Sequence, residues 1–120
     1  MTEYQILIVE DDVELGRAFA DILDSQGMNT ELVMDGRSAL TRLNEYKPDF
    51  VLLDLHLPHV SGLELLEKIR TDQRLKETVV VVVTADALRA KEAQEKADLV
   101  LLKPVSLEQL LHLAAQQFVP

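Results

Sequence analysis

Acidic, hydroxyl and amine side chains follow four of the short apolar runs in this chain, at the point where each run ends. They are Glu10, Asp11 and Asp12 after the first run, Asp54 after the third, Thr84 at the end of the fourth, and Lys103 with Pro104 after the fifth. If the runs are parallel strands of one sheet, their carboxyl ends meet at the same edge. The sequence therefore predicts one site that gathers several carboxylates, a hydroxyl and an ammonium group.

Carboxylates in one cleft repel one another, and two like charges about 4 Å apart cost about 4 kcal/mol at an effective dielectric constant of about 20. Lys103 offsets one of these charges, and a hard cation bound by oxygen offsets the remainder. Mg²⁺ suits such a site, because it takes one or two carboxylates, keeps several waters and is often completed by a phosphate. Asp54 is then either a metal ligand or a nucleophile that forms an aspartyl phosphate. The Thr84 hydroxyl, Lys103 and Mg²⁺ would hold the three phosphoryl oxygens.

Each of these residues also has a plainer interpretation. Asp11 or Asp12 could simply cap a helix that follows the first run, and a lone Lys-Pro pair is usually part of a loop. The convergence of these groups on the ends of neighbouring strands favours a common site over separate structural roles.

The elements that must position these residues show two alternating apolar patterns. Nearly continuous runs rich in Val, Ile and Leu are typical of strands covered on both faces, and they span 6–9, 30–34, 50–53, 79–83 and 99–102. The second run is more polar and is predicted to be an edge strand. Helical spacing between the runs predicts helices around 15–23, 39–43, 63–70, 88–96 and 106–117.

Several local signals bound these helices. Gly27 can stop the first, and the second must close before Pro48. The last begins with a capping box, Ser106 to Gln109. The five β–α repeats in strict alternation predict an α/β fold, an open doubly wound sheet of parallel strands with helices on both faces.

Composition and charge narrow the class of protein further. With 120 residues, 48% hydrophobic and 28% charged, the chain is expected to be one soluble domain, 1–120, with no output domain. The lack of cysteine excludes a disulfide scaffold and thiol chemistry. A net charge of −9 gives no electrostatic footprint for nucleic acid or for an anionic membrane. Without a membrane-length apolar run or a basic amino-terminal leader, a cytoplasmic location is expected.

In combination, four segments resemble the receiver domain of bacterial two-component response regulators, and the resemblance covers essentially the whole chain. The segments are ILIVEDD (6–12), DFVLLDLHLPHVSGLELLEKIR (49–70), VVVVVTA (79–85) and LLKPV (101–105). The resemblance implies a five-stranded flavodoxin-like fold of strand order 2-1-3-4-5 and Mg²⁺ as the cofactor. It also implies a histidine kinase or a histidine phosphotransfer domain as the partner, with an output that the sequence does not identify.

The resemblance also assigns roles to the residues of the predicted reaction. Asp54 resembles the phosphoacceptor, and Thr84 resembles the switch hydroxyl that moves toward the phosphoryl group. Lys103 resembles the lysine that pairs with the carboxylate and then with the phosphate. The Pro104 that follows stands where the family often has a cis peptide bond.

The same resemblance assigns the metal ligands. Asp11 and Asp12 resemble the acidic pair that holds Mg²⁺ directly or through water, with Asp54 completing the carboxylates. His56 takes the position whose backbone carbonyl is a metal ligand. Its side chain is interpreted first as an exposed turn residue and second as a group above the phosphoryl that tunes hydrolysis. Glu10 is interpreted as an acidic helper.

Three features depart from the family pattern. The family usually has Tyr or Phe three residues before the lysine, where this chain has Val100. The stretch from Thr84 to Lys103 is a few residues short, and Lys96-Ala97-Asp98 replaces a Gly-Ala pair before the fifth strand. We therefore expect a short or displaced fourth helix and a muted or rerouted conformational switch.

The function expected from these observations is a phosphoacceptor receiver module of two-component signalling. It would catalyse its own phosphorylation and slow dephosphorylation, yet serve as a signalling domain rather than an enzyme. One alternative is a phosphorylation-independent interaction module with the same fold. Another is a phosphohydrolase with an aspartate nucleophile, although such enzymes place a second aspartate where this chain has His56.

Overall fold

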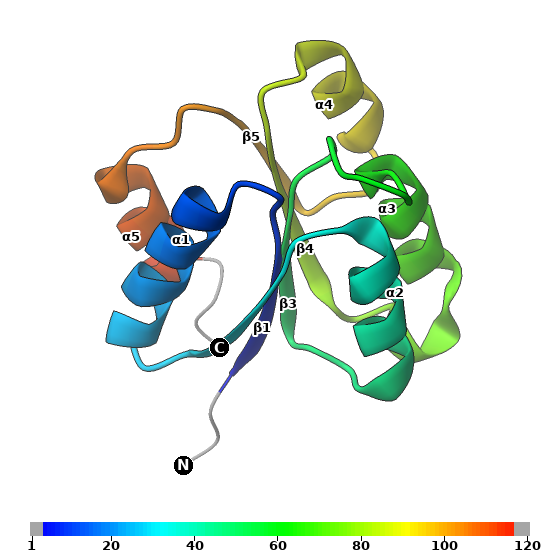
Figure 1. Cartoon of the computed structure of the whole chain (residues 1–120), viewed down its shortest axis with the longest axis horizontal. Coiled ribbons are helices and arrows are strands. Elements are labelled where there is room, and N and C mark those ends of the chain that lie inside the picture. The colour runs from blue at the N-terminus through cyan, green and yellow to red at the C-terminus, as the bar shows by residue number, and fades with distance from the viewer. Residues whose placement is uncertain (1–3, 117–120) are drawn as a thin grey trace.

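The computed structural model of the protein describes residues 4–116 (Figure 1). Within this range, five strands alternate with five α-helices, in the order expected from the sequence. The strands are β1 (Gln5–Val9), β2 (Asn29–Val33), β3 (Phe50–Leu53), β4 (Val79–Thr84) and β5 (Leu99–Leu102). The helices are α1 (Val13–Ser25), α2 (Gly36–Glu45), α3 (Gly62–Thr71), α4 (Ala87–Ala93) and α5 (Leu107–Gln116), with a short 3-10 helix η1 at Gln73–Leu75.

All five strands belong to one parallel sheet, in the order β2-β1-β3-β4-β5. Helices α1 and α5 cover one face of this sheet, and α2, α3 and α4 cover the other (Figure 1). The predicted doubly wound, flavodoxin-like fold is thereby confirmed. The strand order reverses beside β1, which opens a crevice beyond the carboxyl ends of β1 and β3.

The central strands bury both of their faces, which explains why their sequences are continuous apolar runs. In β1, Leu7 and Val9 join the core beneath α2 and α3, whereas Ile6 and Ile8 join the core beneath α1 and α5. The edge strand β2 is partly exposed along its length, as the polar second run predicts.

Short polar side chains fix where the helices begin. The backbone N–H of Leu15 donates to Asp12 Oδ1 (3.2 Å), so Asp12 caps α1. The predicted capping box at α5 is confirmed, because Gln109 N–H donates to Ser106 Oγ (3.1 Å) and Ser106 N–H donates to the Gln109 side chain (2.9 Å). Gly27 follows α1 with a φ of 85°, a conformation that favours glycine.

A short helix, α4, and a 3-10 helix, η1, lie on either side of β4 in the sequence. Helix α4 has only 7 residues, which confirms the expected short fourth helix. Helix η1 was not predicted: it forms because Asp72 ends α3 and its side chain accepts the N–H of Arg74 (2.9 Å). The predicted end of α5 at Gln117 lies outside the described residues. In the described part of the chain, no helix has the length and apolar character to cross a membrane.

Candidate functional site

A cavity of about 400 Å³ lies at the carboxyl ends of β1, β3, β4 and β5. It is lined by Glu10, Asp11, Asp12, Asp54, His56, Ala85, Asp86 and Lys103. Six residues were predicted as acceptor, phosphoryl contact or metal ligand, and five of them line this cavity: Asp11, Asp12, Asp54, His56 and Lys103. Thr84, the sixth, is fully buried at the end of β4, and its Oγ1 accepts the N–H of Asp86 (3.2 Å).

Asp54 follows β3 directly and is 5% exposed. Lys103 Nζ donates to Asp54 Oδ2 (3.0 Å), and the backbone N–H of His56 donates to Asp54 Oδ1 (3.1 Å). Gly62 packs against the backbone of Asp54 and Leu55, and a Cβ on Gly62 would overlap the Asp54 carbonyl oxygen. These contacts fix the Asp54 carboxylate at the base of the cavity, with one donor on each oxygen.

Lys103 reaches the same cavity from the end of β5. Its Nζ also pairs with Glu10 Oε1 at 2.7 Å, so one ammonium group serves two buried carboxylates. Burial alone would lower the pKa of Lys103, but the hydrogen bonds to Glu10 and Asp54 outweigh it and raise that pKa. Lys103 therefore remains charged at neutral pH. The peptide bond from Lys103 to Pro104 is cis, as the resemblance implies.

Glu10 is the most deeply buried acid of the cavity, at 2% exposure. Burial raises its pKa to about 7, against the opposing hydrogen bonds from Lys103 and from the backbone N–H of Asp12. Burial thus makes Glu10 easier to protonate than a free glutamate, and a further positive charge nearby would favour its ionised form.

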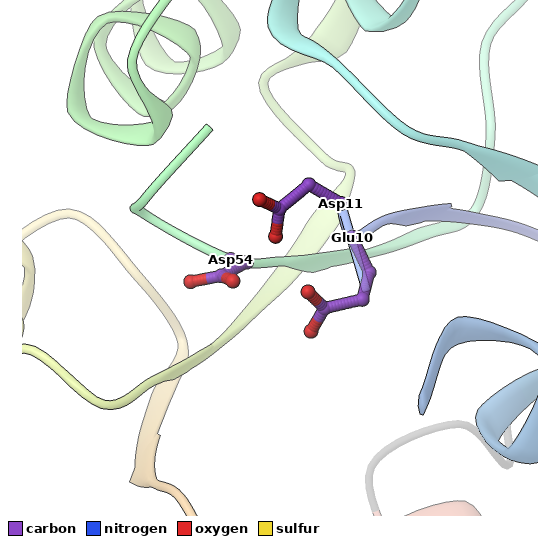
Figure 2. Close-up of side chains that lie close together, drawn as sticks. All are labelled: Glu10, Asp11 and Asp54. Carbon is purple, nitrogen blue, oxygen red and sulfur yellow. The ribbon is translucent and has the colours of Figure 1, made fainter. Parts of the chain in front are cut away.

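Three carboxylates meet around the cavity: Glu10, Asp11 and Asp54 each offer an oxygen, and these oxygens lie within 4.8 Å of one another (Figure 2). Glu10 and Asp54 are buried, while Asp11 is exposed to solvent. An all-oxygen donor set of this kind fits Mg²⁺, which prefers carboxylates and water. The chemistry of the donors therefore agrees with the expected cofactor.

The cluster differs from the predicted acidic pair in one member. Asp12 lines the cavity, but its carboxylate caps α1, whereas Glu10 lies in the carboxylate cluster. A helix-cap signal was available in the sequence, since Asp12 is the last residue before the apolar pattern of α1. The structure thus gathers Glu10 with Asp11, and a metal-binding role for Asp12 stays a prediction.

A second hollow of about 380 Å³ opens beside the first. It is mostly apolar and is lined by Leu15, Phe19, Ala85, Lys103, Pro104 and Val105. Because Lys103 and Ala85 line both spaces, a group that sits in this hollow lies next to Asp54 and its neighbours.

The chain matches the family model of the response regulator receiver domain over residues 6–115. The polar-differentiation response regulator DivK of Brucella anthropi is 32% identical over 109 residues, a match that covers 88% of this chain and 89% of that protein.

Solved structures give the same result. The chemotaxis response regulator CheY4 of Vibrio cholerae matches with a TM-score of 0.88 at 25% identity, over 98% of this chain and 100% of that one. The receiver domain of the sensor histidine kinase PA1611 of Pseudomonas aeruginosa matches with a TM-score of 0.83 at 26% identity, over 93% of this chain and 94% of that one. That structure has a magnesium ion coordinated in its active site cleft.

Proposed function

The chain belongs to the family of response regulator receiver domains, and from this premise we propose that it accepts a phosphoryl group on Asp54 in a Mg²⁺-dependent reaction. The observation that carries this proposal is the setting of the Asp54 carboxylate. It accepts a hydrogen bond from the Lys103 ammonium group and clusters with the carboxylates of Glu10 and Asp11, in a cavity open to a phosphodonor.

In the proposed transfer, an Asp54 carboxylate oxygen attacks the phosphorus of a phosphohistidine on a partner protein. The P–N bond breaks, and its electron pair returns to the imidazole nitrogen of the partner. Lys103, which pairs with Asp54 before transfer, stays beside the new acyl phosphate and neutralises part of its charge. The hydroxyl of Thr84, at the end of β4, is the proposed second contact to the phosphoryl group.

Asp11, Asp54 and the backbone carbonyl of His56 are the groups that would hold Mg²⁺, with Glu10 beside them. When bound, the cation supplies positive charge to the phosphoryl oxygens. We retain Asp12 as a rim residue that caps α1, from which it can hold a metal-bound water. Slow hydrolysis of the acyl phosphate by water resets the site.

The proposed partner is a histidine kinase or a histidine phosphotransfer domain. The apolar hollow beside the site suits the docking of this partner. A partner side chain in the hollow, against Phe19 and Pro104, would bring the phosphohistidine of the partner next to Lys103, which lines both spaces. The proposed downstream target is an output domain or an effector protein reached through the phosphorylated surface, without direct contact of this domain with nucleic acid or a membrane.

The test is intact-mass measurement after incubation with Mg²⁺ and phosphoramidate. The wild type should gain the mass of one phosphoryl group, Asp54→Asn should gain none, and Asp21→Asn, which alters an exposed carboxylate of α1, should behave as the wild type. Full-yield phosphorylation of Asp54→Asn would place the acceptor elsewhere. No mass gain in the wild type would favour an interaction module, and rapid multiple turnover of the donor would favour a phosphohydrolase.

A further inference from the structure

The loop between β3 and α3, residues 54–61, carries both Asp54 and His56, so the path of this loop decides where the His56 carbonyl lies. Its two ends are held locally. At one end, the His56 N–H donates to Asp54 Oδ1 (3.1 Å), and at the other, the Gly62 N–H donates to the Leu55 carbonyl (3.0 Å). The middle of the loop needs a separate support.

Helix α2 supplies that support at its first residue, Gly36. The Gly36 N–H donates to the carbonyl oxygen of Pro58 (3.2 Å). Gly36 is buried, and a Cβ at this position would overlap the carbonyl oxygen of Val60 and lie 2.7 Å from its carbonyl carbon. The loop backbone therefore lies directly against a residue that has no side chain.

Between the contacts at Pro58 and Val60, one residue has an unfavourable backbone conformation. His59, between Pro58 and Val60, has a φ of 70°, in the left-handed region that residues other than glycine rarely adopt. Val60 itself is half-buried and packs against the core beneath α2 and α3. A residue that disfavours its own backbone conformation adopts it where the surroundings impose it.

We propose that Gly36 is a positioning residue for the Mg²⁺ site, acting through the β3–α3 loop. The absence of a Cβ lets the loop approach α2 closely, and this approach fixes the segment that carries the His56 carbonyl. The obstacle to any larger residue is backbone rather than the end of a flexible side chain, so the loop must move aside. The inference rests on the proposed function, because it takes His56 as a metal-binding position.

The experiment compares the wild type with Gly36→Ala by calorimetric titration with MgCl₂ and by electron paramagnetic resonance of bound Mn²⁺. Both readouts measure metal binding without the phosphorylation reaction. Gly36→Ala should raise the Kd for the metal by about 10-fold or more, the loss typical when a group that orients a ligand is altered. The Mg²⁺ concentration that half-saturates phosphorylation by phosphoramidate should rise in parallel, while the rate at saturating Mg²⁺ falls less.

Gly27→Ala is the matched control. Gly27 also has a conformation that an L-residue resists, with a φ of 85°, but no atom lies within 4 Å of the added Cβ, and the residue follows α1, away from the loop. Gly27→Ala should lower the midpoint of urea unfolding and leave the metal Kd unchanged. If Gly36→Ala acts only by destabilising the fold, both variants should have a lower unfolding midpoint, and both should keep the wild-type Kd for the metal.

A second variant covers the case in which Gly36→Ala does not fold. In Gly36→Ala combined with His59→Gly, the loop gains the backbone freedom to move away from the new Cβ, so the fold should recover while the metal Kd stays high. Wild-type metal affinity in either folded Gly36→Ala variant would overturn the inference. A wild type that binds neither Mg²⁺ nor Mn²⁺ would instead overturn the metal site of the proposed function.

Discussion

Lys103 neutralises less charge than its two partners carry. Its ammonium group lies 2.7 Å from Glu10 Oε1 and 3.0 Å from Asp54 Oδ2, and the Asp11 carboxylate lies close by. With all three acids ionised, the cluster would hold a surplus of negative charge. Since Glu10 is buried, a proton on Glu10 or an added cation relieves that surplus.

The raised pKa of Glu10 predicts how stability depends on pH without metal. The pKa is about 7 in the folded protein and 4.5 for an unperturbed glutamate, so folding favours the protonated form. Its contribution to stability is complete below pH about 4.5 and is lost as the pH rises through about 7. At about 1.4 kcal/mol per pKa unit, the loss is on the order of 3 kcal/mol.

Glu10→Gln should remove this dependence. Urea unfolding in EDTA between pH 5 and pH 8 should show a smaller fall in the free energy of unfolding for Glu10→Gln than for the wild type. Addition of Mg²⁺ at pH 8 should recover stability in the wild type. Equal pH slopes for the two proteins would show that another group carries the dependence.

A second prediction separates the roles of Asp11 and Asp12. Mg²⁺ at ten times its Kd should stabilise the wild type by roughly 1.4 kcal/mol. Asp11→Asn should lose this gain, because its carboxylate belongs to the cluster. Asp12→Asn should keep most of it and should fold as stably as the wild type, since asparagine caps a helix as well as aspartate does.

Thermal melts with and without Mg²⁺ measure both effects. If Asp12→Asn loses as much of the Mg²⁺ gain as Asp11→Asn does, Asp12 is a metal-binding residue, as the sequence first indicated.

At the scale of the elements, the start of β5 is fastened to α3 by side chains. Arg70, at the end of α3, donates to the Asp98 carboxylate (2.7 Å) and to the carbonyl of Thr78 (2.9 Å). The same Asp98 oxygen accepts the N–H of Val80 (2.7 Å), a buried residue of β4. Lys96 and Glu67 form a further ion pair between the same two regions. These contacts hold the shortened connection from α4 to β5.

Asp98→Ala should therefore lower the free energy of unfolding by about 2 kcal/mol. The change leaves the buried N–H of Val80 and the guanidinium of Arg70 without this acceptor, and hydrogen bonds to charged groups are worth about 1.5–3 kcal/mol. Lys96→Ala is the control, because its ion pair with Glu67 is about half exposed and such pairs contribute roughly 0–1 kcal/mol. Urea unfolding of both variants measures the difference, and an equal effect of the two substitutions would contradict the assigned role of Asp98.

These elements also show what the sequence could reveal. The strands and most helices were predictable, because burial of both sheet faces produces continuous apolar runs and each helix keeps its own periodicity. Asp54 and Lys103 were predictable because strand ends converge. The choice between Glu10 and Asp12 was harder, since three consecutive acids differ only in which one caps α1. The contact of Gly36 with Val60 joins residues distant in sequence, and no local pattern records it.

Across the molecule, specific contacts attach segments near the site to helices on one face of the sheet. The loop after β3 is joined to α2 through Gly36, and the start of β5 is joined to α3 through Asp98. The residue three before Lys103 is Val100, which is half-buried against the core and stiff at χ1. A ligand at the site can shift the fold only through contacts that differ between two states. Because the loop after β3 and the start of β5 are each held by specific contacts, few of their contacts can differ between two states.

We therefore expect the response to phosphorylation to stay near the cavity. With beryllofluoride as the phosphoryl mimic and Mg²⁺ present, amide hydrogen exchange should slow in residues 56–61 and 85–88, where the loops line or adjoin the site. Residues 97–102 should change little, because Asp98 already ties the start of β5 to α3 and β4, and because Val100 is smaller and stiffer than the aromatic side chain that would swing into the space left by a moving Thr84. Asp54→Asn under the same conditions gives the background. Large exchange differences that spread along β5 and into α5, absent from Asp54→Asn, would show that a full switch operates without an aromatic residue at position 100.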